Sequence, residues 1–171
     1  MTTTVQAISG VSPNAETEIT TEYPSIASTP LGRMLGSLYD SIPVRINGIK
    51  LSYLLFPLPT APIGLLVYLY LKVSGRRYRL TNRSVQIWSM IGERLFTSGA
   101  LSDIAEIRVQ ELPGQRFFKA GDIVLLRADG STLVRLEGVV RPEIFRETIL
   151  EARDARKNVE ASLARIQARS A

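Results

Sequence analysis

Residues 51–83 read LSYLLFPLPTAPIGLLVYLYLKVSGRRYRLTNR and join the most apolar part of the chain to its densest group of cations. From Leu51 to Leu71 there are 21 residues without a charge. A bilayer core of about 30 Å takes roughly 20 apolar residues in a helix, and clustered Lys/Arg mark the cytoplasmic end of such a helix. This stretch therefore predicts a membrane anchor over residues 51–73.

Three prolines interrupt the apolar run at Pro57, Pro59 and Pro62. Proline removes a helical hydrogen bond and clashes with the preceding turn. With Thr60 as N-cap, a helix from there to about Val73 reaches only about 18 Å. Three alternatives remain open: a kinked transmembrane span, a re-entrant segment, and a buried hairpin of a soluble protein. The expected location is the bacterial inner membrane, with the C-terminal domain cytoplasmic and, for a span, the N-terminal tail periplasmic.

The composition excludes several kinds of chemistry. The chain has 171 residues with no Cys and no His, so disulfides, thiolate or imidazole metal sites and Ser-His-Asp triads are ruled out. Paired acids such as Asp103 and Glu106 are typical of strand ends and surfaces. We therefore expect no enzyme activity, no catalytic residues, no metal site and no cofactor.

The positive charge is concentrated beside the apolar run. Residues 72–99 hold six Lys/Arg against one acid, which equals the net charge of +5 for the whole chain. A nucleic-acid binder would spread its basic residues over a face, so nucleic acid is not expected as a partner. Anionic lipid headgroups or an acidic protein surface at the membrane suit the cluster better. The residues predicted to lie at the membrane interface are Lys72, Arg76, Arg77, Arg79 and Arg83.

Residues 1–50 are expected to form an extended tail and connector. The first 30 residues are rich in Ser and Thr, with scattered Pro and Glu, a composition that cannot bury a core and would be ordered only against a partner. Leu31, Leu35 and Leu38 share one helical face, which predicts a short amphipathic helix. Residues 44–49 look extended, with a turn at Asn47-Gly48.

Residues 76–153 are predicted to form a small β-domain with the start of a capping helix. From Arg76 onward apolar and polar residues alternate with a period of two, interrupted by turn residues. The clearest hairpin signal is Asp129-Gly130. Six or seven strands at this spacing predict a small barrel or sandwich.

A long helix is expected to close the chain, with Pro142 in its first turn. Its apolar seam is Phe145, Ile149, Ala152, Arg156, Val159, Leu163 and Ile166, a heptad pattern with one charged exception. The first half should cover the β-core. The extension over residues 154–171 either ends in solvent or uses Val159, Leu163 and Ile166 to dock on a partner or pair with a second copy.

Several motifs resemble the bacterial PH-like domains that occur beside membrane segments. The shared features are the start of the first hairpin (YRLTNR), an Asp-Ile strand entry, a Gly-Asp-Ile strand and a Pro-Glu lead into the last helix. The matching residues are Tyr78, Leu80, Thr81, Asp103, Ile104, Gly121, Asp122, Ile123, Pro142 and Glu143. Ser84 departs from the pattern, because the family often has a further basic residue there. The resemblance covers residues 51 to about 152 and implies a seven-stranded bent barrel capped by a C-terminal helix.

The fold class expected is therefore mostly β with α: a PH-like bent β-barrel or sandwich, a membrane-embedded segment before it and an extended tail. The expected function is that of a membrane-anchored structural subunit that docks on other membrane-protein subunits of a larger bacterial complex. By architecture alone, the host is expected to be a photosynthetic reaction centre–light-harvesting assembly. The alternative is a peripheral module that binds anionic lipid through Lys72–Arg83.

Overall fold

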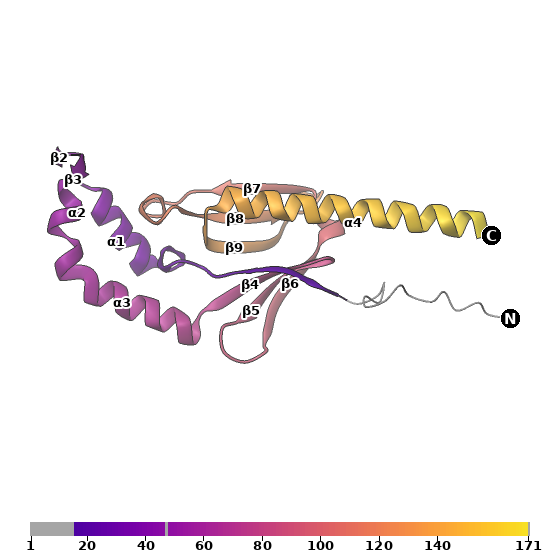
Figure 1. Ribbon diagram of the computed structural model, residues 1–171, viewed down its shortest axis with the longest axis horizontal. Coiled ribbons are helices and arrows are strands. Elements are labelled where there is room, and N and C mark those ends of the chain that lie inside the picture. Colours follow the sequence, from indigo (N-terminus) through magenta and orange to yellow (C-terminus); the bar gives the residue numbers. More distant parts are fainter. Residues whose placement is uncertain (1–15, 47, 171) are drawn as a thin grey trace.

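The computed structural model describes residues 16–46 and 48–170, and the side chains of Leu163 and Ser170 lie outside the described part. Figure 1 shows helices at one end of an elongated molecule, β-sheets in the middle, and a C-terminal helix that runs past the sheets. In chain order the elements are β1 (Glu18–Glu22), η1 (Ile26–Ser28), α1 (Pro30–Asp40), β2 (Arg45–Ile46), β3 (Ile49–Lys50), α2 (Leu51–Leu55), α3 (Pro57–Ser74), β4 (Arg76–Thr81), β5 (Ser84–Ser89), β6 (Leu95–Ala100), η2 (Leu101–Asp103), β7 (Glu106–Gln110), η3 (Arg116–Phe118), β8 (Ala120–Leu126), β9 (Thr132–Val140) and α4 (Pro142–Ser170).

The central strands form two antiparallel sheets. One has the order β1-β4-β5-β6 and the other the order β7-β8-β9, while β2 and β3 form a separate short hairpin. The sheets meet where β6 approaches β9, and Gly99 there lies close to Leu133 and Val134. The predicted hairpin turn at Asp129-Gly130 is confirmed: Gly130 has φ +79°, and the Asp129 carboxylate accepts from the Ser131 N–H at 2.8 Å.

The core lies between the sheets and the first half of α4. Alternation along β4 sends Tyr78 and Leu80 inward and Arg77 and Arg79 outward, as the period of two requires. All seven residues of β8 are buried, because this strand is central in its sheet and α4 covers it. Burial of each large aliphatic side chain here contributes about 2 to 3 kcal/mol.

The C-terminal helix α4 begins at Pro142 and has 29 residues. Phe145, Ile149 and Ala152 are buried in the core, which confirms that the first half covers the β-part. Val159 and Ile166 are exposed. The second half therefore extends beyond the sheets (Figure 1) with two residues of the predicted seam in solvent.

The prediction of a membrane-embedded segment is wrong. Among the described residues, no helix is both long enough and apolar enough to cross a bilayer. The apolar run is divided at Phe56 into α2, of five residues, and α3, of 18 residues. The prolines and Lys72 further reduce the hydropathy of α3. The transmembrane helix, the inner-membrane location and the periplasmic tail are therefore not supported.

The described part of the tail is ordered by the chain itself. β1 pairs antiparallel with β4 from Glu18 opposite Thr81 to Glu22 opposite Tyr78. Thr29 then caps α1 by accepting from the Gly32 N–H at 3.0 Å, with Pro30 at the first helical position. Residues 17–29 thus contact other parts of the same chain, and residues 1–15 lie outside the described part.

Candidate functional site

The most exposed apolar surface belongs to α2 and α3, and we call it the apolar helix platform. Leu58 is 86% exposed and Leu66 is 66% exposed. Folded domains rarely leave a large contiguous apolar patch in solvent unless it binds something. The platform comprises the exposed side chains of Tyr53, Leu54, Leu55, Leu58, Ile63, Leu65, Leu66, Tyr68, Leu69, Tyr70 and Val73.

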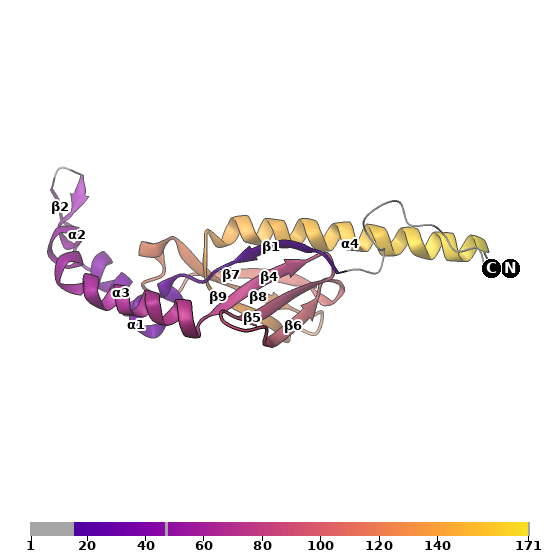
Figure 2. The ribbon, with the colours of Figure 1, turned by 60° about the horizontal axis from the view of Figure 1, so that its bottom comes forward.

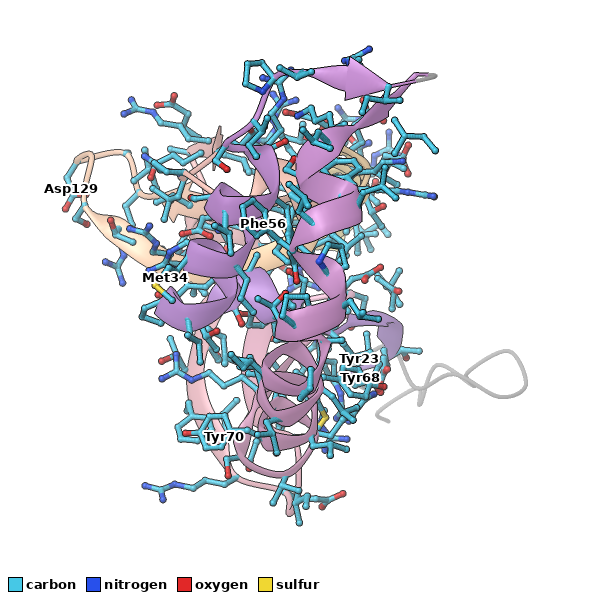
Figure 3. The ribbon with its side chains drawn as sticks, turned by 90° about the vertical axis from the view of Figure 1, so that its left-hand side faces the viewer. Tyr23, Met34, Phe56, Tyr68, Tyr70 and Asp129 are labelled. Carbon is cyan, nitrogen blue, oxygen red and sulfur yellow. The ribbon has the colours of Figure 1, made fainter. Side chains whose placement is uncertain are left out.

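Helix α3 is apolar around its whole circumference. Val67 is the one residue of α3 that is buried against the rest of the described chain. Figure 3 shows Tyr68 and Tyr70 on opposite sides of the helix, while Met34 points outward from α1. A helix of this kind is normally enclosed by a larger protein or by a membrane. Contact with α1 covers only a narrow stripe of it.

An open groove of about 510 Å³ lies at the C-terminal end of α1, beside Asp40 and Lys50. This groove is not part of the platform. The groove that belongs to the platform has a volume of about 480 Å³ and lies between α1 and α3. Its walls are almost entirely apolar and include Leu31, Leu66, Val67 and Tyr70. A depression of this size accepts apolar side chains from a partner helix.

An aromatic cluster fixes α1 and α2 to the β-part. The Phe117 ring lies 4.6 Å from the Tyr39 ring and 5.2 Å from the Tyr53 ring, between centroids, and 4.8 Å from that of Phe118. Such pairs add about 0.5 to 1.5 kcal/mol each beyond burial. Ser52 is fully buried and donates its hydroxyl to the Tyr39 carbonyl. The platform is therefore held on a fixed base.

The five predicted interface cations lie on several elements. Lys72 is in the last turn of α3, where its ammonium lies 5.4 Å from the Tyr23 ring and 5.5 Å from the Tyr68 ring. Figure 3 shows these two rings beside each other. Arg76 lies over the Phe96 ring at 5.5 Å. Both cations are thus placed next to aromatic faces, an arrangement worth about 0.5 to 1 kcal/mol at exposed sites.

Arg77 and Arg79 lie on the outer face of β4, and Arg83 lies in the link to β5. Arg79 pairs with Glu18 at 3.0 Å and lies 5.1 Å from the Trp88 ring. Arg77 and Arg79 therefore share the outer face of β4, whereas Arg76 in the same strand lies over the Phe96 ring. The lipid-headgroup role of the five cations stays a prediction.

The predicted docking seam on α4 is only partly described. Val159 is 50% exposed and Ile166 is 61% exposed, while the side chain of Leu163 lies outside the described part. Arg156, the charged exception in the seam, pairs with Glu160 at 2.7 Å. Self-pairing through this helix stays a prediction.

A buried carboxylate organises the junction between β8, β9 and the connection that precedes β8. Asp122 is 1% exposed, and its Oδ2 pairs with Arg135 at 2.6 Å. Its Oδ1 accepts from Gln115 Nε2 at 2.6 Å and from the Gly138 N–H at 2.9 Å. Burial opposes the charge, but these three donors outweigh it and hold the pKa of Asp122 below its ordinary value. Asp122 is therefore a structural anion.

Sequence analysis missed a second polar cluster, on the outer face of β4 and β5. Thr81, Ser84 and Gln86 are buried polar residues that all donate to the Glu16 carboxylate. Their alternation with the core residues Val85 and Ile87 was a usable signal, because it places several polar side chains on one face of a strand. Among residues 16–46 and 48–170, no group of three or more acids is arranged to hold a metal ion.

Comparison with known proteins finds no matching family model, no similar curated protein and no similar solved structure. The resemblance to PH-like domains therefore stays a prediction, as does the photosynthetic host.

Proposed function

We propose that this protein is a non-enzymatic docking subunit that binds another protein through the apolar helix platform. The observation that carries the proposal is the exposure of α3, an 18-residue helix with one buried residue. The free energy of burying such a surface, at about 25 cal/mol per Å², favours association. The β-part and the aromatic cluster at Phe117 serve as the base that presents the helix.

The occupant we infer is a different protein that encloses α3 with several apolar helices. A second copy of α3, packed side by side, would cover one stripe and leave the opposite side in solvent. Tyr68 and Tyr70 point to opposite sides of α3, so covering both requires a partner that encloses the helix. The groove between α1 and α3 would receive a side chain from one of the partner's helices.

The charges at the end of the platform favour an acidic rim on the partner. From Leu51 to Leu71 the sequence has no charge, and Lys72 and Arg76 then follow. Complementary charge at an interface rim speeds association and selects orientation more than it adds affinity. Acids on the partner beside the C-terminal end of α3 would set the direction in which the two proteins meet.

Site-specific photo-cross-linking in the producing cell tests this proposal. p-Benzoylphenylalanine is placed at Leu66 or Leu69 on the platform, or at Asp129 in the exposed β8–β9 turn as the matched control. We expect one defined protein to be cross-linked from Leu66 and Leu69 and not from Asp129. Leu66→Lys and Leu69→Lys should abolish co-purification of that protein, and circular dichroism should be unchanged because both side chains are exposed.

The other outcomes contradict the proposal. Adducts only with lipid would assign the platform to a membrane surface, and adducts only with this chain would assign it to a second copy. Equal labelling from Asp129 would show that the cross-links are unspecific. The absence of any adduct at Leu66 and Leu69 would mean that the platform has no partner in the cell.

A further inference from the structure

We propose that the edge and outer face of β4 form a binding site for an extended acidic segment of another protein, and that residues 16–22 of this chain occupy it intramolecularly. The site is separate from the apolar helix platform and does not depend on the function proposed for it. Figure 2 shows β1 lying along β4 at the edge of its sheet.

The central feature of the site is a receptor for one carboxylate. Glu16 Oε1 accepts from Thr81 Oγ1 at 2.6 Å, from Ser84 Oγ at 2.6 Å and from Gln86 Nε2 at 2.9 Å. Hydrogen bonds from Ser84 and Thr81 lower the pKa of Glu16, with further help from Arg83 and Gln86, against a smaller opposing effect of burial. The site therefore favours the charged carboxylate over a neutral side chain.

Bonds within the receptor hold the donors in place without help from Glu16. The Ser84 N–H donates to Thr81 Oγ1 at 2.9 Å, and Gln86 Nε2 donates to Ser84 Oγ at 2.9 Å. Trp88 Nε1 donates to Gln86 Oε1 at 2.7 Å, which directs the amide nitrogen of Gln86 toward the carboxylate. A pre-organised receptor binds with less loss of entropy.

A second subsite recognises the acid two residues further on. Glu18 pairs with Arg79, whose guanidinium lies over the Trp88 ring. Arg77 shares this face of β4, and its buried Nε has no hydrogen-bond partner among the described residues. The chemistry therefore selects a segment with the pattern Glu-x-Glu followed by extended residues.

The backbone supplies the remaining contacts. The Asn82 N–H donates to the Thr17 carbonyl at 3.0 Å, and the Thr17 N–H donates to Asn82 Oδ1 at 3.0 Å. The ladder then continues from Thr20 opposite Leu80 to Glu22 opposite Tyr78. Strand addition of this kind provides affinity through the main chain and specificity through side-chain subsites.

Strand β1, which occupies the site in this chain, contributes no buried side chain to the core. None of the five residues of β1 is buried, and its one aliphatic side chain, Ile19, is 49% exposed. Thus β1 is held by main-chain hydrogen bonds and carboxylates, which another acidic segment can reproduce. An exposed strand edge is a template for such pairing.

The fixed point after β1 argues against a second copy of this chain as the source of the segment. The Ser25 N–H donates to the Gly138 carbonyl at 2.9 Å, and Ala27 is fully buried. Only Tyr23 and Pro24 lie between β1 and this fixed point, and two residues reach at most about 7 Å. A strand exchanged between copies would require their sheets to meet within that distance, whereas a separate protein has no such restriction.

Fluorescence anisotropy with the synthetic peptide ETEITTEY, residues 16–23 labelled with fluorescein, tests the proposal on the full chain. The double variant Glu16→Gln/Glu18→Gln weakens the resident strand and leaves the receptor unchanged. We expect this variant to bind the peptide at least tenfold more tightly than the unchanged chain, in which β1 competes at high effective concentration. Trp88, the sole tryptophan of the sequence, gives a second, label-free signal.

The matched control changes the peptide and not the protein. QTQITTEY should bind the double variant at least tenfold more weakly than ETEITTEY. The proposal is overturned if the unchanged chain and the double variant bind equally, if neither binds, or if the two peptides do not differ. Light scattering that finds the unchanged chain dimeric and the double variant monomeric would assign the segment to a second copy and also overturn it.

Discussion

Tyr39 and Thr60 share a hydrogen bond of 2.6 Å between their hydroxyl groups, and this bond joins α1 to the first turn of α3. Thr60 in turn donates to the Phe56 carbonyl at 2.6 Å, so Tyr39 is the donor to Thr60. A residue that the sequence suggested as a helix cap therefore acts one turn inside the helix. It ties the platform helix to its base.

Replacing Tyr39 with Phe removes this bond and leaves the ring in the aromatic cluster. We expect a loss of about 1 kcal/mol in the free energy of unfolding, or roughly 2 to 4 °C in Tm for a chain of this size. Tyr70→Phe is the control, because Tyr70 is exposed on the platform. Equal shifts for the two variants in thermal unfolding would show that the Tyr39–Thr60 bond contributes nothing.

Gly36 allows α1 to approach the β7–β8 connection. A Cβ on Gly36 would lie 2.0 Å from the Gly114 carbonyl oxygen, which cannot move aside as a flexible side chain would. We expect Gly36→Ala to lower the free energy of unfolding by more than 2 kcal/mol. Gly64, inside α3, has nothing within 4 Å of the added Cβ, so Gly64→Ala should raise stability by about 0.5 to 1 kcal/mol. Urea unfolding of both variants checks the opposite signs.

Asp122→Asn should be among the most destabilising single changes in the β-part. The amide keeps the volume but loses the charge that pairs with Arg135, and its NH₂ group would face a cation. We expect a loss of about 3 kcal/mol. Arg135→Gln should cost only about 1 kcal/mol, because Arg135 is 43% exposed and Asp122 keeps Gln115 and Gly138 as donors.

The pH dependence of this difference follows from the lowered pKa of Asp122. A carboxyl group whose pKa is lower in the folded state stabilises the fold at pH values above its pKa in the unfolded chain, here 3.8. This stabilisation is lost as the pH falls through the pKa of the folded state. The difference in the free energy of unfolding between the unchanged chain and Asp122→Asn should therefore be largest at pH 6 and should decrease below about pH 4. A gap that stays constant from pH 6 to pH 3 in urea titrations would contradict the pairing.

The two halves of α4 should respond differently to truncated side chains. Ile149 is fully buried, and Ile149→Ala should cost about 2 to 5 kcal/mol. Val159 is half exposed beyond the sheets, and Val159→Ala should change stability by less than about 0.5 kcal/mol. A large effect at Val159 in the isolated chain would mean that this half of the helix is already packed against something, such as a second copy.

Local patterns in the sequence predicted the elements that depend on neighbours in the chain. The alternation around Tyr78 and Leu80, the Asp129-Gly130 turn and the Pro142 helix start were all visible as short-range signals. The membrane segment is wrong because the charge-free run is not one helix: the break at Phe56-Pro57 divides it into two.

The contact of Glu16 with this polar cluster could not be predicted, because the two are far apart in the sequence. Glu16 contacts Ser84 and Gln86, which follow it by 68 and 70 residues. A tail rich in Ser and Thr has no alternation of apolar residues that would predict a strand. The tail is ordered by polar contacts with a sheet that is distant in the sequence. No hydrophobic periodicity within the tail encodes these contacts.

The acids of the tail should affect the docking of β1 in opposite directions. Hydrogen bonds from Ser84 and Thr81 lower the pKa of Glu16, whereas burial raises that of Glu22. Glu16 therefore stabilises docking above about pH 4.5, its unfolded value, and loses this effect as pH falls further. Glu22 opposes docking while it is charged, and protonation relieves the penalty as pH falls through its raised pKa.

At neutral pH, Glu16→Gln should speed amide hydrogen exchange along β1 at least tenfold, and Glu22→Gln should slow it. Glu18, which pairs with Arg79, lies nearby and is unchanged in both variants. Exchange measured by mass spectrometry on the β1 segment separates the effects from global stability, for which the strand β8 is the internal reference. If both variants accelerate exchange in β1 equally, the two carboxylates act only through the net charge of the tail. The receptor formed by Thr81, Ser84 and Gln86 would then not discriminate between Glu16 and Glu22.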